Sequence, residues 1–276
     1  MNDAKTINLN ADLGESFGPW SMGDDAAMLD LVGSANIACG FHAGDPMVMR
    51  ATLLAAKARG VSVGAHPGYA DLQGFGRRPL ALSTAEVEAL LIYQVGALQG
   101  MAASEGMAVT HVKPHGALNN QACADRALAD AIARAVKALD PTLILLAPAC
   151  SHLALAGRVA GLPVVDEIFA DRRYQDDGQL VPRSQPGAVI HDPGLALAHV
   201  RAMLDAGALV SASGQQIPVQ AGSICIHGDS PDAVALARHL RDGLVAAGYR
   251  LVALTAIGQT PFADLAVEVR HPPSTE

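Results

Sequence analysis

The sequence predicts an α/β fold, a (β/α) barrel of about seven parallel strands that forms a single domain over residues 1–276. Strand and helix patterns alternate along nearly the whole chain with no linker between them. Polar and charged side chains follow six of the predicted strands. An open sheet gathers ligands mainly at its switch point, whereas a barrel brings the loops of all its strands to one mouth. The spread of these side chains therefore favours a barrel over an open sheet.

The first half of the chain contains four predicted strand–helix units. The strands are expected at residues 6–11, 35–39, 61–66 and 109–114. Asp45 suits a helix N-cap and Pro46 the first helical position, so a helix begins there. Ser83 and Glu86 have the spacing of a capping box and begin a long helix. A short helix at 24–32 fills the space between the first two strands.

The second half continues the alternation with one interruption. Helices are predicted at 125–139, 151–160 and 195–206, and strands at 143–147, from 162 and through Ile226. Residues 175–191 are rich in Gly, Pro, Asp and Gln and predict a long excursion without regular structure. Residues 209–219 resemble a short hairpin. Ser230-Pro231-Asp232 begins the last long helix, and the polar tail after Ile257 is expected to be loose.

Composition excludes several classes of function. The formal net charge is −8 and no basic run is present, which argues against a nucleic-acid partner. The polar N-terminus lacks the apolar segment of a signal peptide, and no apolar run is long enough to span a membrane, so a cytoplasmic protein is expected. Cys39, Cys123, Cys150 and Cys225 form no CxxC pair, which argues against a disulfide framework and a zinc-thiolate site, and buried thiols are predicted at Cys39 and Cys225.

The predicted strand ends carry the side chains that could do chemistry. We predict that they converge in one pocket at the barrel mouth. The candidate site residues are Asp12, Glu15, His42, His66, Lys113, His115, Glu167, Asp171, Arg172 and His227. A lone histidine is more commonly a hydrogen-bonded structural residue, but repeated placement after strands favours a shared site. A structural role is predicted for His152, His199, His239 and His271.

These residue types leave two chemistries open. Carboxylates and imidazoles together can bind a divalent ion such as zinc or manganese, or can perform general acid–base hydrolysis without a metal. Lys113 and Arg172 supply positive charge for a carboxylate, a phosphate or a developing oxyanion. The Gly-rich segment 67–79, with two arginines, is either a substrate-covering loop or a solvated surface loop. No P-loop, Rossmann fingerprint or nucleophile elbow is present.

Six segments spread over residues 7 to about 254 closely resemble the A-subunit family of 5-oxoprolinases, also called the LamB/YcsF group. They are residues 8–15 (NLNADLGE), 35–45 (ANIACGFHAGD), 63–69 (VGAHPGY), 112–118 (VKPHGAL), 167–174 (EIFADRRY) and 225–229 (CIHGD). The resemblance is specific because several long motifs occur in the same order. One departure is Asn119, which stands where the family pattern leads us to expect a tyrosine and bears on substrate preference.

The resemblance implies an activity that the residues alone do not. Family members act with two partners, the B and C subunits of 5-oxoprolinase, to open the lactam of 5-oxo-L-proline to L-glutamate, with ATP as co-substrate cleaved to ADP and phosphate. It also implies a barrel related to polysaccharide deacetylases and glycoside hydrolases, which often hold a metal through Asp and His. On that basis a divalent metal would be held by Asp12, His42, His66 and His115.

Chemical reasoning assigns roles within that activity. A lactam is a stabilised amide, and phosphorylation of its carbonyl oxygen would make it a good electrophile for water. Lys113 and Arg172 would then hold the phosphate or the substrate carboxylate. Asp12 or Glu15 would activate water, and a histidine would protonate the ring nitrogen.

Two alternatives remain at this point. One is a stand-alone divalent-metal-dependent deacetylase or amidohydrolase, which needs a metal but no ATP. The other is a binding or regulatory component whose partners hold the catalytic groups. Metal analysis with chelation tests the first, and titration of the isolated chain with oxoproline and ATP tests the second.

Overall fold

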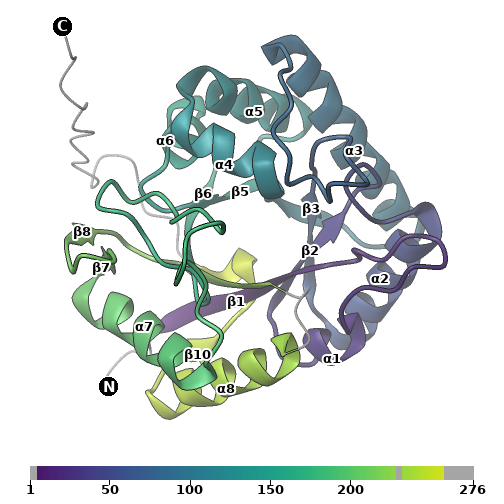
Figure 1. The fold of residues 1–276 in the computed structure, drawn as a ribbon. Coiled ribbons are helices and arrows are strands. Elements are labelled where there is room, and N and C mark those ends of the chain that lie inside the picture. The colour runs from purple at the N-terminus through teal and green to yellow at the C-terminus, as the bar shows by residue number, and fades with distance from the viewer. Residues whose placement is uncertain (1–4, 228–231, 258–276) are drawn as a thin grey trace, which may run out of the picture.

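Seven parallel strands close into a barrel in the computed structural model, which describes residues 5–227 and 232–257 (Figure 1). The strands are β1 (Thr6–Leu13), β2 (Ser34–Ala38), β3 (Ser62–His66), β4 (Val109–Val112), β5 (Ile144–Pro148), β6 (Val164–Phe169) and β9 (Ser223–His227). Each strand pairs in parallel with the next, and β9 pairs with both β6 and β1. This closure confirms the predicted barrel.

Helices surround the strands on the outside of the barrel (Figure 1). They are α1 (Asp25–Leu29), α2 (Pro46–Arg59), α3 (Thr84–Ser104), α4 (Gly116–Ala124), α5 (Arg126–Leu139), α6 (His152–Ala160), α7 (Pro193–Ala206) and α8 (Ala233–Ala246). Asp45 caps α2 by accepting from the amides of Met47 and Val48. The predicted capping box at the start of α3 is also present. No described helix is long and apolar enough to cross a membrane.

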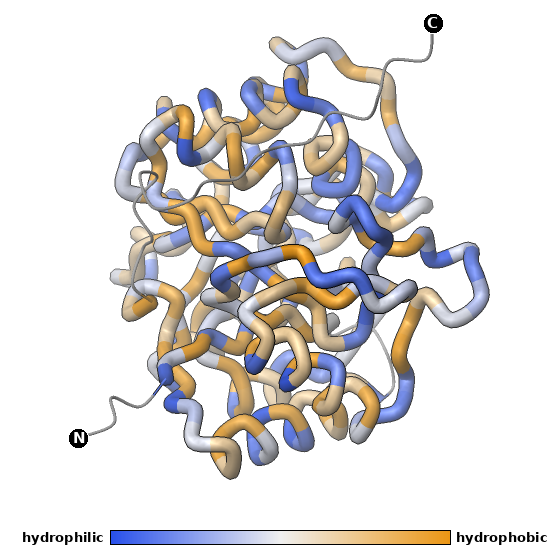
Figure 2. The backbone as a smooth tube through the Cα atoms, turned by 90° about the vertical axis from the view of Figure 1, so that its left-hand side faces the viewer, coloured by the Kyte–Doolittle hydropathy of each residue, from blue (hydrophilic) through white to orange (hydrophobic). Residues whose placement is uncertain are grey.

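The sequence patterns did not predict α4. This helix has nine residues and a polar Asn-Asn-Gln centre, and its buried face includes small side chains such as Ala117 and Ala122. A short helix of this composition has little periodic signal, and tertiary packing decides its formation. In Figure 2 hydrophobic and hydrophilic residues alternate along the turns of other helices, as expected of helices with one apolar face.

The remaining segments largely follow the predictions. β7 (Ala208–Val210) and β8 (Gln216–Pro218) form the expected antiparallel hairpin. Residues 175–191 contain no named helix or strand, as expected. All four cysteines are free. The predicted helix start at Ser230-Pro231 and the tail from 258 onward lie outside the described residues.

The two ends of the barrel interior differ in chemistry. The end opposite the mouth is closed by apolar side chains, with Ile144, Leu146 and Val165 packed on Leu254. Leu254 belongs to a 3₁₀ turn (Leu254–Ala256) that follows β10 (Arg250–Leu251), and its amide donates to Ser34 Oγ at 3.0 Å. This closure leaves the opposite end of the barrel for the site.

Polar side chains fill the middle of the barrel. Alternate residues of a strand share one face, which explains why Asn10 and Asp12 both contact groups of other strands inside the barrel. Asn36 lies on the neighbouring strand and accepts from His111 Nε2 at 2.9 Å if that nitrogen carries the proton. Gly64 makes room for this ring, because a Cβ there would lie only 2.2 Å from His111 Cδ2. Burial lowers the pKa of His111 to about 3, so it is a neutral structural residue.

Candidate active site

Four side chains form a tight buried cluster at the carboxyl ends of the first four strands. Glu15 follows β1, His42 follows β2, His66 ends β3 and His115 follows β4. One potential ligand atom from each lies within 4.8 Å of all the others. The rings of His42 and His115 stack at a centroid distance of 3.7 Å. The structure thus brings together four of the predicted site residues from loops far apart in the sequence.

The hydrogen bonds of His66 and His115 leave two nitrogen lone pairs facing each other. His66 Nδ1 lies 2.7 Å from the carbonyl oxygen of Lys113, and His115 Nε2 lies 2.8 Å from that of Phe75. A carbonyl only accepts, so each of these ring nitrogens donates. The other nitrogens, His66 Nε2 and His115 Nδ1, are 3.0 Å apart. Two acceptors at this distance require a cation between them, either a proton or a metal ion.

The distances in the cluster fit a divalent metal. Ligands bound to zinc at about 2.0–2.1 Å in a tetrahedron lie roughly 3.3–3.4 Å from one another. Glu15 Oε1 lies 3.3 Å from His42 Nε2 and 3.5 Å from His115 Nδ1. Burial holds the pKa of His42 and of His115 well below the usual range, so both rings are neutral and can donate lone pairs. The donor set therefore suits zinc or a similar ion.

Glu15 takes the place in this set that the sequence prediction gave to Asp12. Asp12 Oδ2 borders the cluster at 3.4 Å from His66 Nε2. Its Oδ1 accepts from Lys113 Nζ at 2.9 Å and from Asn36 Nδ2 at 2.8 Å. Asp12 therefore connects the histidine cluster to a second group of charges.

That second group is a buried lysine between two carboxylates. Lys113 Nζ lies 2.9 Å from Asp12 Oδ1 and 3.1 Å from Glu167 Oε1. Burial lowers the pKa of Lys113, but Asp12, Cys225 and Glu167 together outweigh it and hold that pKa well above its usual range. Burial raises the pKa of Glu167, and Lys113 opposes this rise. The ammonium group is thus held charged at the barrel mouth, beside the cluster.

The loop after β3 covers the cluster and orients His115. The carbonyl of Phe75 accepts from His115, and the Phe75 ring packs edge-on against His42 and His115. Phe75 has a φ of 55° and Gly76 a φ of 61°, so both lie in the left-handed region. Arg78 binds the Asp71 carboxylate through Nε and Nη2, which closes the loop. The loop therefore packs against the cluster, and its covering of a substrate stays a prediction.

The variant Gly76→Ala tests whether the close packing of this loop on the cluster supports metal binding. A Cβ there would lie 2.7 Å from His42 Cβ and 2.9 Å from the His115 ring, so the loop must shift away from the cluster. Metal affinity is expected to fall about 10–100-fold, the usual cost of losing an outer-shell partner, as measured by competition with a chelating dye. Gly60→Ala is the matched control, because Gly60 has a φ of 66° but no atom near its missing Cβ. Equal metal affinity in both variants would contradict this function of the loop.

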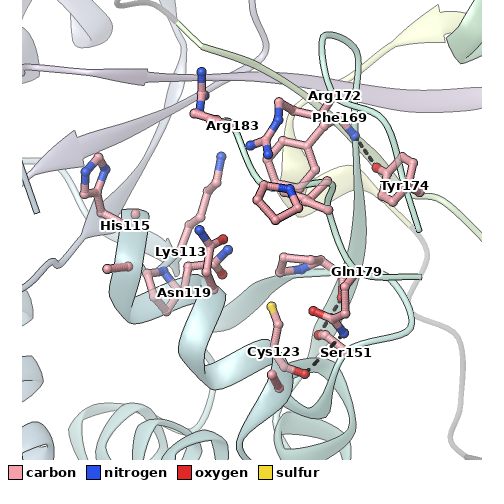
Figure 3. Close-up of a pocket in the computed structure, with 18 of the residues that line it drawn as sticks. Lys113, His115, Asn119, Cys123, Ser151, Phe169, Arg172, Tyr174, Gln179 and Arg183 are labelled. Atoms are coloured by element: carbon pink, nitrogen blue, oxygen red, sulfur yellow. Dashed lines mark hydrogen bonds between the residues drawn. The ribbon is translucent and has the colours of Figure 1, made fainter. Parts of the chain in front are cut away.

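A cavity of about 590 Å³ opens beside both groups (Figure 3). His66, His115, Asp12 and Lys113 form its wall on the side of the cluster, and α4 forms another wall. The excursion 175–191 contributes a further wall, which gives this irregular segment a function that its composition did not predict. In Figure 3 the side chains of Lys113 and Arg172 extend toward the same part of the cavity.

Not every predicted residue reaches this cavity. Arg172 and Asn119 line it, whereas the buried side chain of Asp171 does not. His227 ends β9 with its backbone paired to Asp12, but its side chain lies outside the described part of the chain. Among the residues given a structural role, His199 lies on α7 with Nε2 3.0 Å from the Arg172 carbonyl. His271 lies outside the described residues.

The prediction missed several residues that support the site. Asn10 donates to Glu167 Oε1 at 2.9 Å, and Asn36 donates to Asp12. Cys225 accepts from Lys113 Nζ at 2.9 Å. The alternation of Asn8, Asn10 and Asp12 along β1 was the available signal, since it places three polar residues on the same face of a strand.

Comparisons with known proteins agree with this architecture. The sequence model of the LamB/YcsF family matches residues 7–259. A protein of Azoarcus sp. (strain BH72) named as the A-subunit of 5-oxoprolinase is 60% identical over 92% of this chain and 99% of its own. A protein of the same name from Rhodopseudomonas palustris (strain BisB18) is 58% identical over 88% and 96%. The crystal structure of a lactam utilization protein from Thermus thermophilus superimposes with a TM-score of 0.85 at 47% identity, covering 90% of this chain and 99% of that one.

Proposed function

Because this chain belongs to the LamB/YcsF family, we propose that it is the A-subunit of an ATP-dependent 5-oxoprolinase and supplies the hydrolytic site. The reaction opens the lactam of 5-oxo-L-proline to L-glutamate. The names of close relatives support the assignment, and one structural observation supports the chemistry. That observation is the Glu15–His42–His66–His115 cluster beside the Asp12–Lys113–Glu167 group, open to a cavity of about 590 Å³.

Different residues of this chain can perform different steps of the hydrolysis. A divalent ion held by the cluster would supply Lewis-acid chemistry that makes water a better nucleophile near neutral pH. Asp12 lines the cavity and accepts the proton of the attacking water. The Lys113 ammonium, held by Asp12 and Glu167, stabilises negative charge that develops on oxygen at the reacting centre. His66 and His115 cannot protonate the leaving ring nitrogen as the sequence suggested for a histidine, because each donates its one N–H to a backbone carbonyl. Asp12 instead passes the proton it took from water to that nitrogen.

The B and C subunits are the partners that use ATP in the proposed reaction. Phosphorylation of the lactam oxygen by the partners would turn a stable amide into an electrophile with a good leaving group. One water adds to the activated carbon, the C–N bond breaks as the ring nitrogen takes up a proton, and an acyl phosphate remains. A second water cleaves the acyl phosphate, which releases phosphate and leaves the new carboxylate. This division of labour is supported by the absence of a GxxxxGK[ST] motif in this chain. A supply of ATP makes the cytoplasm the expected location of the assembly.

The decisive assay measures glutamate formation from 5-oxoproline with ATP, with and without the B and C subunits. We expect turnover only with all three components. We also expect chelation to abolish glutamate formation and added zinc or manganese to restore it. ATP-independent hydrolysis of a cyclic or acetylated amide by this chain alone would instead favour a stand-alone metal-dependent amidohydrolase or deacetylase. Full activity after complete metal removal would contradict a metal-assisted site.

A further inference from the structure

Two polar groups at the cavity are buried without hydrogen-bond partners. Arg172 is 5% exposed, and its Nε has no partner. Asn119 is 6% exposed, and its Oδ1 has none. Both residues line the cavity (Figure 3). Buried polar atoms are nearly always hydrogen-bonded. A buried donor or acceptor without a partner has lost its hydrogen bonds to water, and no protein hydrogen bond offsets the free-energy cost of that loss. Two such atoms in one cavity indicate that a ligand completes them.

The charge around Arg172 specifies the kind of ligand. Its single side-chain hydrogen bond within the described residues goes from Nη2 to the carbonyl of Val181 at 2.7 Å. No ion pair joins Arg172 to a carboxylate in the described part of the chain. Burial lowers the pKa of Arg172 to about 10, the charge of Arg183 acts in the same direction, and the neighbouring Asp171 carboxylate opposes them. Arg77 and Arg183 also line the cavity.

Lys113 does not add to the positive charge that is available to a ligand in the cavity. Two carboxylates, Asp12 and Glu167, already neutralise its ammonium group. Arg172 and Arg183 belong to the chain after β6, and within the described residues no ion pair joins either of them to Asp12 or Glu167. A planar guanidinium with a free Nε–H is suited to an oxyanion, since it can form two parallel hydrogen bonds to two oxygens.

We propose that Arg172 binds an oxyanion of the substrate and that Asn119 binds the uncharged amide of its ring. This inference rests on the proposed function, because it assigns the two ends of 5-oxoproline to two residues of the same cavity. The oxyanion is either the substrate carboxylate or a phosphoryl group added to the lactam oxygen. Arg172 is thus the residue that selects an anionic lactam over a neutral one, and Asn119 contributes equally to binding both.

Calorimetric titration of the metal-loaded chain distinguishes the two possible oxyanions, the substrate carboxylate and the phosphoryl group. The probes are 5-oxoproline, 2-pyrrolidinone, which lacks the carboxylate, and inorganic phosphate. For a carboxylate contact, the wild type binds 5-oxoproline more tightly than 2-pyrrolidinone, and Arg172→Gln lowers 5-oxoproline affinity about 10–100-fold without changing 2-pyrrolidinone affinity. For a phosphoryl contact, the same variant loses phosphate affinity instead. Asn119→Leu weakens 5-oxoproline and 2-pyrrolidinone by equal factors in either case.

Arg173→Gln is the matched control, because Arg173 is the exposed neighbour of Arg172 and does not line the cavity. It is expected to bind all three probes as the wild type does. Thermal melts and Arg172→Lys, which keeps the charge without the fork, separate a binding defect from misfolding. If Arg172→Gln folds and changes neither 5-oxoproline nor phosphate binding, or if the wild type binds neither anion, the proposal is wrong.

Failure of the proposed oxyanion site can be distinguished from failure of the proposed function. Glutamate formation by the assembled enzyme without any effect of Arg172→Gln on anion binding would overturn only the recognition site. Anion binding that depends on Arg172, in an assembly that makes no glutamate from 5-oxoproline, would overturn the proposed function and leave the anion site standing.

Discussion

Replacing His115 by alanine is expected to remove tight binding of the divalent ion and to lower glutamate formation by the assembled enzyme more than roughly 100-fold. His115 contributes one of the two nitrogens that face each other at 3.0 Å, and its ring also stacks on His42. The loss of a ligand should exceed the roughly 10–100-fold effect of losing an outer-shell partner. Elemental analysis of the purified variant and coupled glutamate assays measure the two effects.

His239→Ala is the control for this variant, because His239 is an exposed residue of α8. It should retain both metal and activity. If the His115 variant folds and keeps a full equivalent of tightly bound metal, the cluster is not the metal site. If it loses the metal but keeps full activity with the B and C subunits, the ion has no function in the reaction.

Replacing Lys113 by methionine is expected to have the largest effect on stability. The substitution leaves Asp12 and Glu167 buried without the cation that now lies 2.9 and 3.1 Å from them. Breaking a buried ion pair by removing one partner costs about 3–5 kcal/mol of unfolding free energy. Oxoproline-dependent phosphate release by the assembly should be lost as well, because the charge at the reacting end of the cavity is gone. Urea unfolding and a phosphate assay measure these effects.

The stability loss of the Lys113 variant should depend on pH. Burial already raises the pKa of Glu167, and without Lys113 nothing opposes that rise as strongly. A carboxyl whose pKa is higher in the folded chain than in the unfolded chain favours folding below the unfolded pKa, about 4.3 for Glu. This contribution disappears as the pH rises through the folded pKa. The deficit relative to wild type should therefore be smallest near pH 4 and grow toward pH 7.

Lys137→Met provides the comparison, because Lys137 is an exposed lysine on α5. Its unfolding free energy should stay within about 0.5 kcal/mol of wild type at both pH values, as is usual for surface substitutions. A Lys113 variant as stable as the Lys137 variant at pH 7 would show that the two carboxylates do not depend on the buried ammonium.

Local patterns in the sequence predicted most elements of the fold. Asp45 and Pro46, and the pair Ser83 and Glu86, marked helix starts that the structure contains, because capping depends on residues within one turn. The strands were recognisable as short apolar runs between helices. The prediction that His42, His66 and His115 meet followed from one rule, that parallel strands in a barrel end at the same mouth.

Only the tertiary structure decided which side chains touch. It placed Glu15 rather than Asp12 in the four-residue cluster, where the left-handed Gly14 turns the chain after β1. It also formed α4 and left Arg172 and Asn119 with unmet polar atoms at the cavity. The sequence by itself determined the elements, their order and the edge where the site lies, because caps and periodic burial are local. The contacts within the site depend on strand register and barrel closure, which join residues as far apart in the chain as Asn10 and Ser223 and leave no local pattern.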